Sequence, residues 1–239
     1  MLKDDEVLEN LDSVNYKIIQ KKKGFKVTLD PILLVNFLNI RKNVKILDIG
    51  TGTGIMPLLL GKKEEIEKIV AVEINKEIAN MFSRSLELNG INDKIEVFCC
   101  DIKDFKESNF DYIISNPPYM KVEEGKVSEE DYRASARHEI KLNLKEFLYT
   151  SKRFLKNGGS LNVIYPTKRF FEFMEEAKSL NLNPKRIRLV HTKPEKESEL
   201  FLIELIKGHK CNCIFEKTLI IFNENNQYTE EVKKYYGIK

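Results

Sequence analysis

The stretch 111–119, with the sequence DYIISNPPY, holds the residues best suited to chemistry. Its apolar first half predicts a short strand, and two consecutive prolines end that strand at Asn116 because proline lacks an N–H and fixes φ. The Asn116 side chain and the Pro117 carbonyl are then placed to accept hydrogen bonds beside the ring of Tyr119. A planar heterocycle with an exocyclic amine fits such a tip, because the acceptors hold the amine and the ring stacks. The candidate catalytic residues are Asn116, Pro117, Pro118 and Tyr119.

The same tip is also compatible with an ordinary strand-ending turn, because asparagine and proline are both common in turns. A glycine-rich turn at residues 48–54 favours the chemical interpretation. Its glycines allow a tight bend and the close approach of a ligand to the backbone. Glu73 follows about twenty residues later, where a carboxylate can accept hydrogen bonds from both ribose hydroxyls. Asp101 ends the next predicted strand, where it can accept a hydrogen bond from an adenine amine.

Together these strand ends predict a pocket for an adenosine-containing cofactor. The glycine spacing is G-x-G-x-G and not the G-x-G-x-x-G of dinucleotide sites. Asp48 would also repel a pyrophosphate, whereas it can accept a hydrogen bond from the ammonium of a methionine-like tail. We therefore favour S-adenosylmethionine over NAD. The candidate cofactor-binding residues are Asp48, Gly50, Thr51, Gly52, Gly54, Glu73, Ile74, Asp101, Ile102 and Asn116.

Strands and helices alternate from residue 44 onward, and this pattern predicts a doubly wound, mostly parallel, seven-stranded α/β sheet. The first and fourth strands of such a sheet flank the point where strand order reverses, so the cofactor pocket is expected to face the 116–119 tip. We predict a domain at 44–239 after a small extension at 1–43. The predicted strands are 45–50, 68–74, 94–100, 111–115, 160–165, 186–191 and 200–206, and the predicted helices are 55–60, 78–89, 144–155 and 168–180.

The N-terminal extension contains weaker patterns. Residues 2–11 predict a short acidic helix or a loose arm, and 16–20 with 25–28 predict a hairpin that turns at Gly24. Asp30 is expected to cap a helix whose first turn contains Pro31.

Composition excludes several classes of protein. The chain has 239 residues, 42% of them apolar and 32% charged, as in a globular domain. No run approaches the length of a membrane span, and the acidic N-terminus does not resemble a secretory signal, so we expect a cytoplasmic protein. The sequence leaves the oligomeric state open, and we favour a monomer. The cysteine spacings do not match zinc sites, so free or structural thiols are favoured and no metal is predicted.

The layout resembles the Rossmann-like S-adenosylmethionine-dependent methyltransferases, and N-P-P-Y resembles the motif of members that methylate the exocyclic amine of adenine or other planar amides. The segments 16–20, 28–34, 136–139, 185–191 and 228–232 resemble the bacterial tRNA1(Val) (adenine-37-N6)-methyltransferases. This resemblance implies methyl transfer from S-adenosylmethionine to N6 of an unstacked adenine in tRNA, at position 37 of the anticodon loop of a valine tRNA.

An RNA substrate would require cations to contact phosphate. The segment 120–139 follows the tip directly and is either a lid over RNA or a solvated loop. The candidate RNA-binding residues are Lys21, Lys22, Lys23, Lys26, Arg133, Arg137, His138, Arg186, Lys193 and Lys196.

Other functions stay open on sequence alone. The same fold could methylate a glutamine side chain of a release factor, although such an enzyme would need an N-terminal helical domain to bind the protein. It could also methylate guanine N2 in rRNA, or adenine in DNA with a target-recognition domain that the sequence does not contain. An NAD-dependent oxidoreductase or a non-catalytic nucleotide-binding module represents a different class.

Overall fold

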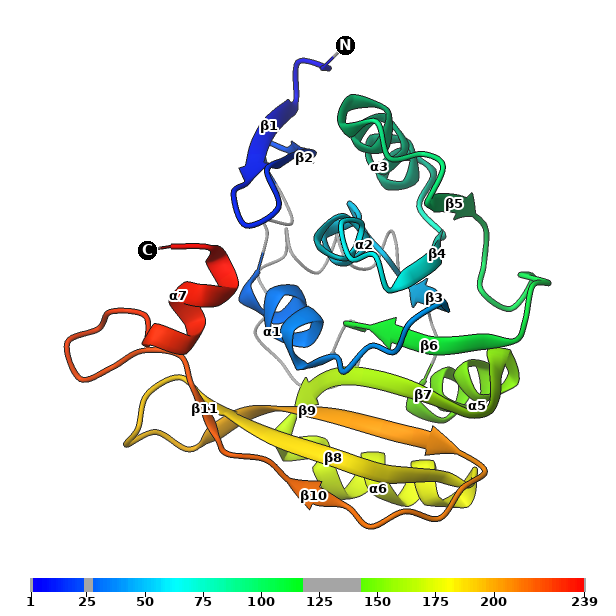
Figure 1. Ribbon diagram of the computed structural model, residues 1–239, viewed down its shortest axis with the longest axis vertical. Coiled ribbons are helices and arrows are strands. Elements are labelled where there is room, and N and C mark those ends of the chain that lie inside the picture. Colours follow the sequence, from blue (N-terminus) through cyan, green and yellow to red (C-terminus); the bar gives the residue numbers. More distant parts are fainter. Residues whose placement is uncertain (1, 24–27, 118–142, 239) are drawn as a thin grey trace.

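The computed structural model describes residues 2–23, 28–117 and 143–238 (Figure 1). Within them the chain forms a two-stranded hairpin and a nine-stranded sheet in the order β10-β8-β9-β7-β6-β3-β4-β5, with β11 also paired to β8. The strands of the larger sheet are β3 (Val44–Ile49), β4 (Ile66–Glu73), β5 (Ile95–Cys99), β6 (Phe110–Ser115), β7 (Leu155–Pro166), β8 (Leu182–His191), β9 (Ser198–Lys207), β10 (Ile214–Phe215) and β11 (Leu219–Ile220).

The predicted fold class is confirmed. All seven predicted strands are present, and β9 alone among them runs antiparallel to its neighbours β7 and β8. The structure adds β10 and β11, two-residue strands that pair in parallel with β8. They are too short to give a recognisable apolar pattern in the sequence.

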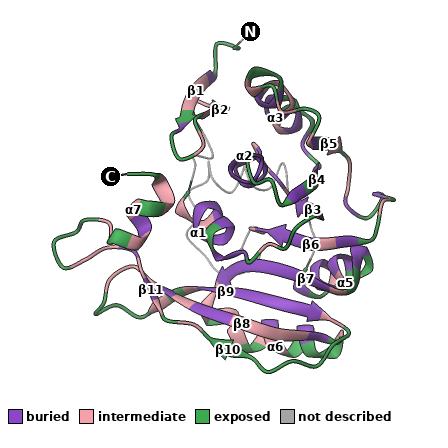
Figure 2. Ribbon diagram, in the orientation of Figure 1, coloured by how far each residue is buried: buried purple, intermediate pink, exposed green. Residues whose placement is uncertain are grey.

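Helices cover both faces of the sheet, as Figure 1 shows. Successive strand residues point to opposite faces, so on β3 the side chain of Ile46 packs in the core under α1 and α2, while Leu47 packs in the core under α5 and α6. The central strands are buried on both sides (Figure 2). The helical segments are α1 (Leu29–Phe37), α2 (Ile55–Leu60), α3 (Lys76–Asn89), α5 (Leu144–Phe154), the 3-10 turn η1 (Thr167–Arg169), α6 (Phe170–Ser179) and α7 (Glu230–Tyr236).

The strand order reverses between β3 and β6, which lie side by side in parallel. From β3 the chain continues to β4 and β5 on one side, whereas β6 continues to β7 on the other. The Ser115 hydroxyl at the end of β6 donates a 2.8 Å hydrogen bond to the carbonyl of Ile49 at the end of β3. The two strand ends are therefore joined at the position where open α/β sheets bind their ligands.

The N-terminal region differs from the prediction. Residues Glu6–Leu11 form β1, not a helix or a loose arm, and β1 pairs with β2 (Tyr16–Lys21) in a hairpin. The turn falls at 12–15, where Asn15 adopts a positive φ of 54°; asparagine tolerates that conformation better than most residues. Pairing the acidic strand with the basic strand places Glu6 opposite Lys21 and is favoured electrostatically. The predicted turn at Gly24 and the predicted pairing of 16–20 with 25–28 involve residues outside the described ones.

The helix predicted near Pro31 is present, but Thr28 and not Asp30 occupies the N-cap position. Buried α1 residues such as Leu33 and Leu34 belong to the core of the large sheet. The hairpin forms a sheet of its own, but its Leu11 and Ile18 pack in the same core. A domain boundary between residues 43 and 44 stays a prediction.

The hairpin is attached to α3 by polar contacts. The Ile19 amide donates to Ser85 Oγ (3.0 Å), and Asn89 exchanges two hydrogen bonds with the backbone of Lys17 (2.8 and 2.7 Å). Glu6, only 3% exposed, accepts hydrogen bonds from the Arg84 guanidinium at 2.8 and 2.5 Å. These bonds lower the pKa of Glu6 from 4.5 to about 2. The Glu6–Arg84 pair is therefore a pH-sensitive link between the hairpin and α3.

Stability should depend on this link. Because the folded pKa of Glu6 lies below the unfolded value, the contribution is complete above pH 4.5 and is lost as the pH falls toward 2. The shift corresponds to ~3 kcal/mol at neutral pH. Urea unfolding should show that Glu6→Gln lowers the free energy of unfolding at pH 7 and lowers it much less at pH 3. Glu9→Gln on the same strand is the control. Equal losses from Glu6→Gln at both pH values would contradict this assignment.

Candidate active site

The glycine turn after β3 is shaped by three positive φ angles, at Gly50 (71°), Gly52 (59°) and Gly54 (86°). The amides of Gly50 and Thr51 both donate to the Val72 carbonyl (2.9 and 3.1 Å), which holds the turn against β4. A methyl group on Gly54 would lie 2.1 Å from the Phe82 ring on α3, so this glycine is needed for packing. A methyl group on Gly52 would meet no protein atom within 4 Å. Gly52 therefore leaves space for a ligand beside the backbone.

Glu73 at the end of β4 is held by two backbone amides. Its Oε2 accepts from Gly52 N at 2.9 Å and its Oε1 from Asn75 N at 2.8 Å. Asn75 in turn caps α3, where its Oδ1 accepts from the amides of Glu77 and Ile78. Each carboxylate oxygen can accept a further hydrogen bond. Glu73 is thus oriented beside the glycine turn with acceptor capacity for two ribose hydroxyls.

Asp48 is completely buried at the end of β3. Its Oδ2 accepts a 2.7 Å hydrogen bond from the Thr51 hydroxyl, whereas its Oδ1 has no hydrogen-bond partner among the described residues. Burial, with a smaller contribution from the charge of Glu73, raises the pKa of Asp48 to about 7. A buried carboxyl group with an unused acceptor favours a cationic partner. The ammonium of S-adenosylmethionine fits this requirement.

The residues that follow β5 and β4 supply both polar and apolar side chains to the site. Asp101 lies two residues past Cys99, which pairs with Glu73 in the sheet. The Asp101 carboxylate accepts a 2.8 Å hydrogen bond from the Lys103 amide, and Ile102 is buried. Ile74 keeps 37% of its surface exposed next to Glu73. Ile74 can therefore pack against the face of a flat heterocycle. The carboxylates of Glu73 and Asp101 can bind the polar groups of the same ligand.

The tip predicted to hold the acceptor lies directly beside the glycine turn. Asp48 pairs with Ile114 in the register of β3 and β6. Asn116, two residues past Ile114, is therefore level with Gly50 across a strand spacing of about 5 Å. Asn116 and Pro117 are both half-buried. Pro118 and Tyr119 lie outside the described residues.

Several side chains that were predicted to contact RNA instead contact other residues of this chain. Lys21 pairs with Asp5 and with Glu77, and the ammonium of Lys22 donates to the Asp4 carbonyl at 2.7 Å. Lys21 is therefore paired with carboxylates, whereas Lys22 is exposed and keeps its charge, and RNA contacts by both stay predictions.

The side chain of Arg186 is only 14% exposed. Its guanidinium contacts Glu204 (2.5 Å), Glu216 (2.7 Å) and the Phe37 carbonyl (2.9 Å). The prediction that Arg186 contacts RNA therefore has no support, because Arg186 links β8 to α1 and its charge is already neutralised.

Three other candidates have different positions. Lys23 is exposed after β2, while Lys193 (half-buried) and Lys196 (exposed) lie in the β8–β9 loop. This loop follows the carboxyl end of β8 and therefore lies at the same edge of the sheet as Asn116. The remaining candidates lie outside the described residues: Lys26, Arg133, Arg137 and His138.

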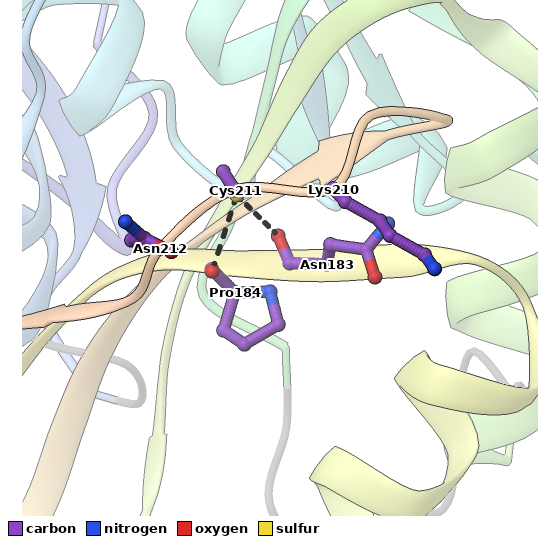
Figure 3. A pocket seen from close by; sticks show the side chains of 5 residues that line it. All are labelled: Asn183, Pro184, Lys210, Cys211 and Asn212. Carbon is purple, nitrogen blue, oxygen red and sulfur yellow. Dashed lines mark hydrogen bonds between the residues drawn. The ribbon is translucent and has the colours of Figure 1, made fainter.

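A hollow at the opposite edge of the sheet does not belong to this site. Figure 3 shows Lys210, Cys211 and Asn212 beside the first residues of β8, with the Cys211 thiol donating to the Pro184 carbonyl at 3.3 Å. All four cysteines are free thiols. No group of three metal-ligating side chains occurs within residues 2–23, 28–117 and 143–238.

The sequence analysis missed two positioning residues. Asn75 orients Glu73 through its amide and caps α3; its position before an apolar helical pattern could have revealed the cap. Ser115 joins β6 to β3. No local pattern distinguishes this serine from others, because its partner carbonyl is 66 residues away.

Comparison with known proteins identifies the family. Residues 28–179 match the model of the methyltransferase small domain. The chain belongs to this methyltransferase family. It is 30% identical over 223 residues to a tRNA1(Val) (adenine(37)-N6)-methyltransferase of Bacteroides fragilis, covering 92% of each chain. A protein of the same name from Actinobacillus pleuropneumoniae is 28% identical, with 91% of each chain covered. The resemblance seen in the sequence is therefore confirmed.

Solved structures support the same fold. A predicted O-methyltransferase from Agrobacterium tumefaciens superposes with a TM-score of 0.69 at 22% identity, covering 87% of this chain and 95% of that one. The enzyme TYW2 of M. jannaschii, in complex with AdoMet, gives a TM-score of 0.58 at 14% identity and covers 87% and 89%.

The protein is thus an S-adenosylmethionine-dependent methyltransferase, and the cofactor prediction is confirmed. The cofactor supplies a methyl group bonded to a positively charged sulfur. No helix in the described residues is long and apolar enough to cross a membrane.

Cofactor affinity should depend on the ionisation of Asp48. An ammonium group favours the carboxylate form, whereas burial raises the pKa of Asp48 to about 7. Binding of S-adenosylhomocysteine should therefore release a proton at low pH and should strengthen by roughly 20-fold between pH 5.5 and 7.5. Isothermal titration calorimetry would measure this dependence. Asp48→Asn should bind weakly with little change over the same range, and a pH-independent wild type would contradict the role of Asp48.

Gly52 and Gly90 allow a matched test of whether the cofactor occupies the space beside Gly52. Gly52 and Gly90 have similar φ values (59° and 63°), and a methyl group on either meets no protein atom within 4 Å. Replacement by alanine should therefore lower stability by a similar amount, about 1 kcal/mol. Only Gly52→Ala should weaken binding of S-adenosylhomocysteine, by tenfold or more, because the methyl group would occupy ligand space. Equal affinities of the two variants in calorimetry would show that Gly52 does not contact the cofactor.

Proposed function

We propose that this enzyme transfers a methyl group from S-adenosylmethionine to N6 of an unstacked adenine in tRNA, adenine 37 in the anticodon loop of a valine tRNA. The observation that carries this proposal is the pairing of β3 with β6, which brings Asn116 and Pro117 beside the glycine turn. The names of the relatives from Bacteroides fragilis and Actinobacillus pleuropneumoniae support the same substrate.

The reaction needs the amine to be oriented and made more nucleophilic. The lone pair of adenine N6 is delocalised into the ring, so it must be drawn toward a tetrahedral arrangement before it attacks. The Asn116 side-chain oxygen and the Pro117 carbonyl can each accept one N–H of the amine and thereby favour that arrangement. The N–C bond forms as the C–S bond breaks, the electron pair stays on sulfur, and the proton leaves nitrogen afterwards. Catalysis is mainly orientation and acceptor placement.

An adenine inside a helical stack cannot reach this tip. Sequence-specific RNA recognition favours single-stranded loops, where a base can be turned out of the stack at low cost. An anticodon loop offers such a purine. Within our proposal Pro118 and Tyr119 complete the tip, with the tyrosine ring stacked on the target base.

Methylation of a release-factor glutamine receives less support. That alternative requires an N-terminal helical domain to bind the protein substrate. The described N-terminal residues form the β1–β2 hairpin followed by α1, and α1 packs in the core of the large sheet. Within residues 2–23 and 28–43, the helix that precedes β3 is α1, and its apolar side chains are already used in that core.

The acceptor can be tested directly. Purified enzyme and labelled S-adenosylmethionine should be offered total tRNA, rRNA, DNA and release factor separately. We expect label in tRNA as N6-methyladenosine. Asn116→Ala should lower kcat by roughly 100-fold or more, because one acceptor of the reacting amine is lost, while the affinity for S-adenosylhomocysteine stays within about threefold.

The exposed Asn212, remote from the site, provides the matched control, and Asn212→Ala should behave as wild type. Label that appears only in protein, or full activity of Asn116→Ala, would overturn the proposal.

A further inference from the structure

The turn after β7 reaches the same edge of the sheet as the acceptor tip. Ser115 at the end of β6 pairs with Val163 on β7. The last residue of β7 is Pro166, three residues further on, so β7 extends about 10 Å beyond the end of β6. The turn η1 and the first residues of α6 therefore stand beside and beyond Asn116, on the side of the tip away from the glycine turn.

The start of α6 presents an exposed aromatic side chain, Phe171, that packs on other aromatic rings. Phe201 is completely buried in the core, the Phe170 ring packs on it at 5.0 Å, and the Phe171 ring packs on Phe170 at 5.9 Å, both edge to face. Phe171 is 87% exposed, the most exposed large apolar side chain in the described part of the chain. A single exposed phenylalanine is not unusual. Here, however, the Phe171 ring packs on Phe170, and it lies at the edge of the sheet where ligands bind.

The backbone under Phe171 is fixed from both sides. The Arg169 guanidinium binds Glu172 with two hydrogen bonds (2.9 and 2.7 Å) and lies 5.1 Å from the centre of the Tyr165 ring. The Thr167 hydroxyl shares a 3.0 Å hydrogen bond with Ser198 at the start of β9. Because the turn is already ordered, little conformational entropy is lost when a ligand contacts it.

Lysines lie on the segments at this edge of the sheet. Lys168 is exposed three residues before Phe171. The β8–β9 loop with Lys193 and Lys196 lies at the same edge, since Pro166 of β7 and Val190 of β8 both pair with Leu200 of β9. Residues 167–172 and 192–197 contain four cations and three carboxylates, and Glu172 is bound to Arg169. An exposed aromatic ring beside lysines is the combination that binds single-stranded nucleic acid.

We propose that Phe171 and Lys168 form a second nucleotide-binding position, at which Phe171 stacks on the unpaired base next to the target adenine and Lys168 contacts the adjoining phosphate. The inference rests on the proposed RNA substrate. The occupant is not the target adenine, because that base is held at Asn116 and Pro117. The position would favour an adenine within a single-stranded loop over an isolated nucleotide.

The test measures RNA binding without catalysis. Enzyme saturated with S-adenosylhomocysteine is titrated with a fluorescent, unmodified anticodon stem-loop of a valine tRNA. Phe171→Ala should raise Kd by roughly 5- to 100-fold, as expected for loss of one base–aromatic stack. Phe171→Trp should retain the wild-type affinity. Phe215→Ala is the matched control, because Phe215 is also exposed (66%) but pairs beside Ile187, well before the end of β8.

Lys168→Ala should weaken binding and should reduce the slope of log Kd against log salt by about 0.7, the value for one phosphate contact on a single strand. In methylation assays Phe171→Ala should raise KM for the stem-loop and leave kcat at saturating RNA within about twofold, since Phe171 does not touch the reacting amine. Unchanged melting temperatures would show that both variants fold.

The failures of the two proposals are distinguishable. Wild-type enzyme that methylates tRNA, together with a Phe171→Ala variant that binds the stem-loop as tightly as wild type, would overturn only the stacking position. Loss of affinity in Phe215→Ala equal to that in Phe171→Ala would also overturn it. Wild-type enzyme that neither binds nor methylates tRNA would overturn the proposed function and this inference with it.

Discussion

The parallel pairing of β3 with β6 is the constraint on which the rest of the site depends. It sets the Asp48 carboxyl and the glycine turn level with the residues that follow β6, and the Ser115–Ile49 hydrogen bond fixes this alignment at the strand ends. A slip of one residue would turn the side chains of β6 to the opposite faces of the sheet. The apolar side chains of β6 are buried on both faces, so such a slip would force both close-packed cores to repack.

Two neighbouring carboxyl groups serve different purposes because their surroundings differ. Glu73 receives two backbone hydrogen bonds, which stabilise its charge and fix its direction. Asp48 receives one hydroxyl hydrogen bond and is buried, so its charged form is disfavoured until a cation approaches. The pair is therefore suited to a ligand that offers hydroxyl groups at one end and an ammonium at the other. A dinucleotide would instead place an anionic pyrophosphate at the glycine turn, close to the Asp48 carboxyl group.

Many charged side chains in this protein hold one structural element to another through ion pairs. Arg84 holds the hairpin to α3 through Glu6, and Arg188 on β8 contacts Glu231 and Tyr235 of the C-terminal helix α7. A basic run in the sequence therefore does not identify a nucleic-acid surface, because the acidic partner can lie far along the chain. The cations at the carboxyl edge differ in that the fold places them at the same edge of the sheet as Asn116.

The sequence alone determined the sheet, the glycine turn, the carboxylates at strand ends and the end of β6 before Asn116, because each depends on local backbone limits or on an apolar repeat. The same local rules predicted a helix or a loose arm at 2–11, where the structure has β1 paired with β2, since a strand partner depends on contacts with α3 and on opposite charges across the pair. Only the tertiary structure decided that Arg186 is neutralised, that Ser115 joins two strands, and that Phe171 is exposed while Phe173 is buried. Such properties depend on neighbours brought together by folding, and no local pattern encodes them.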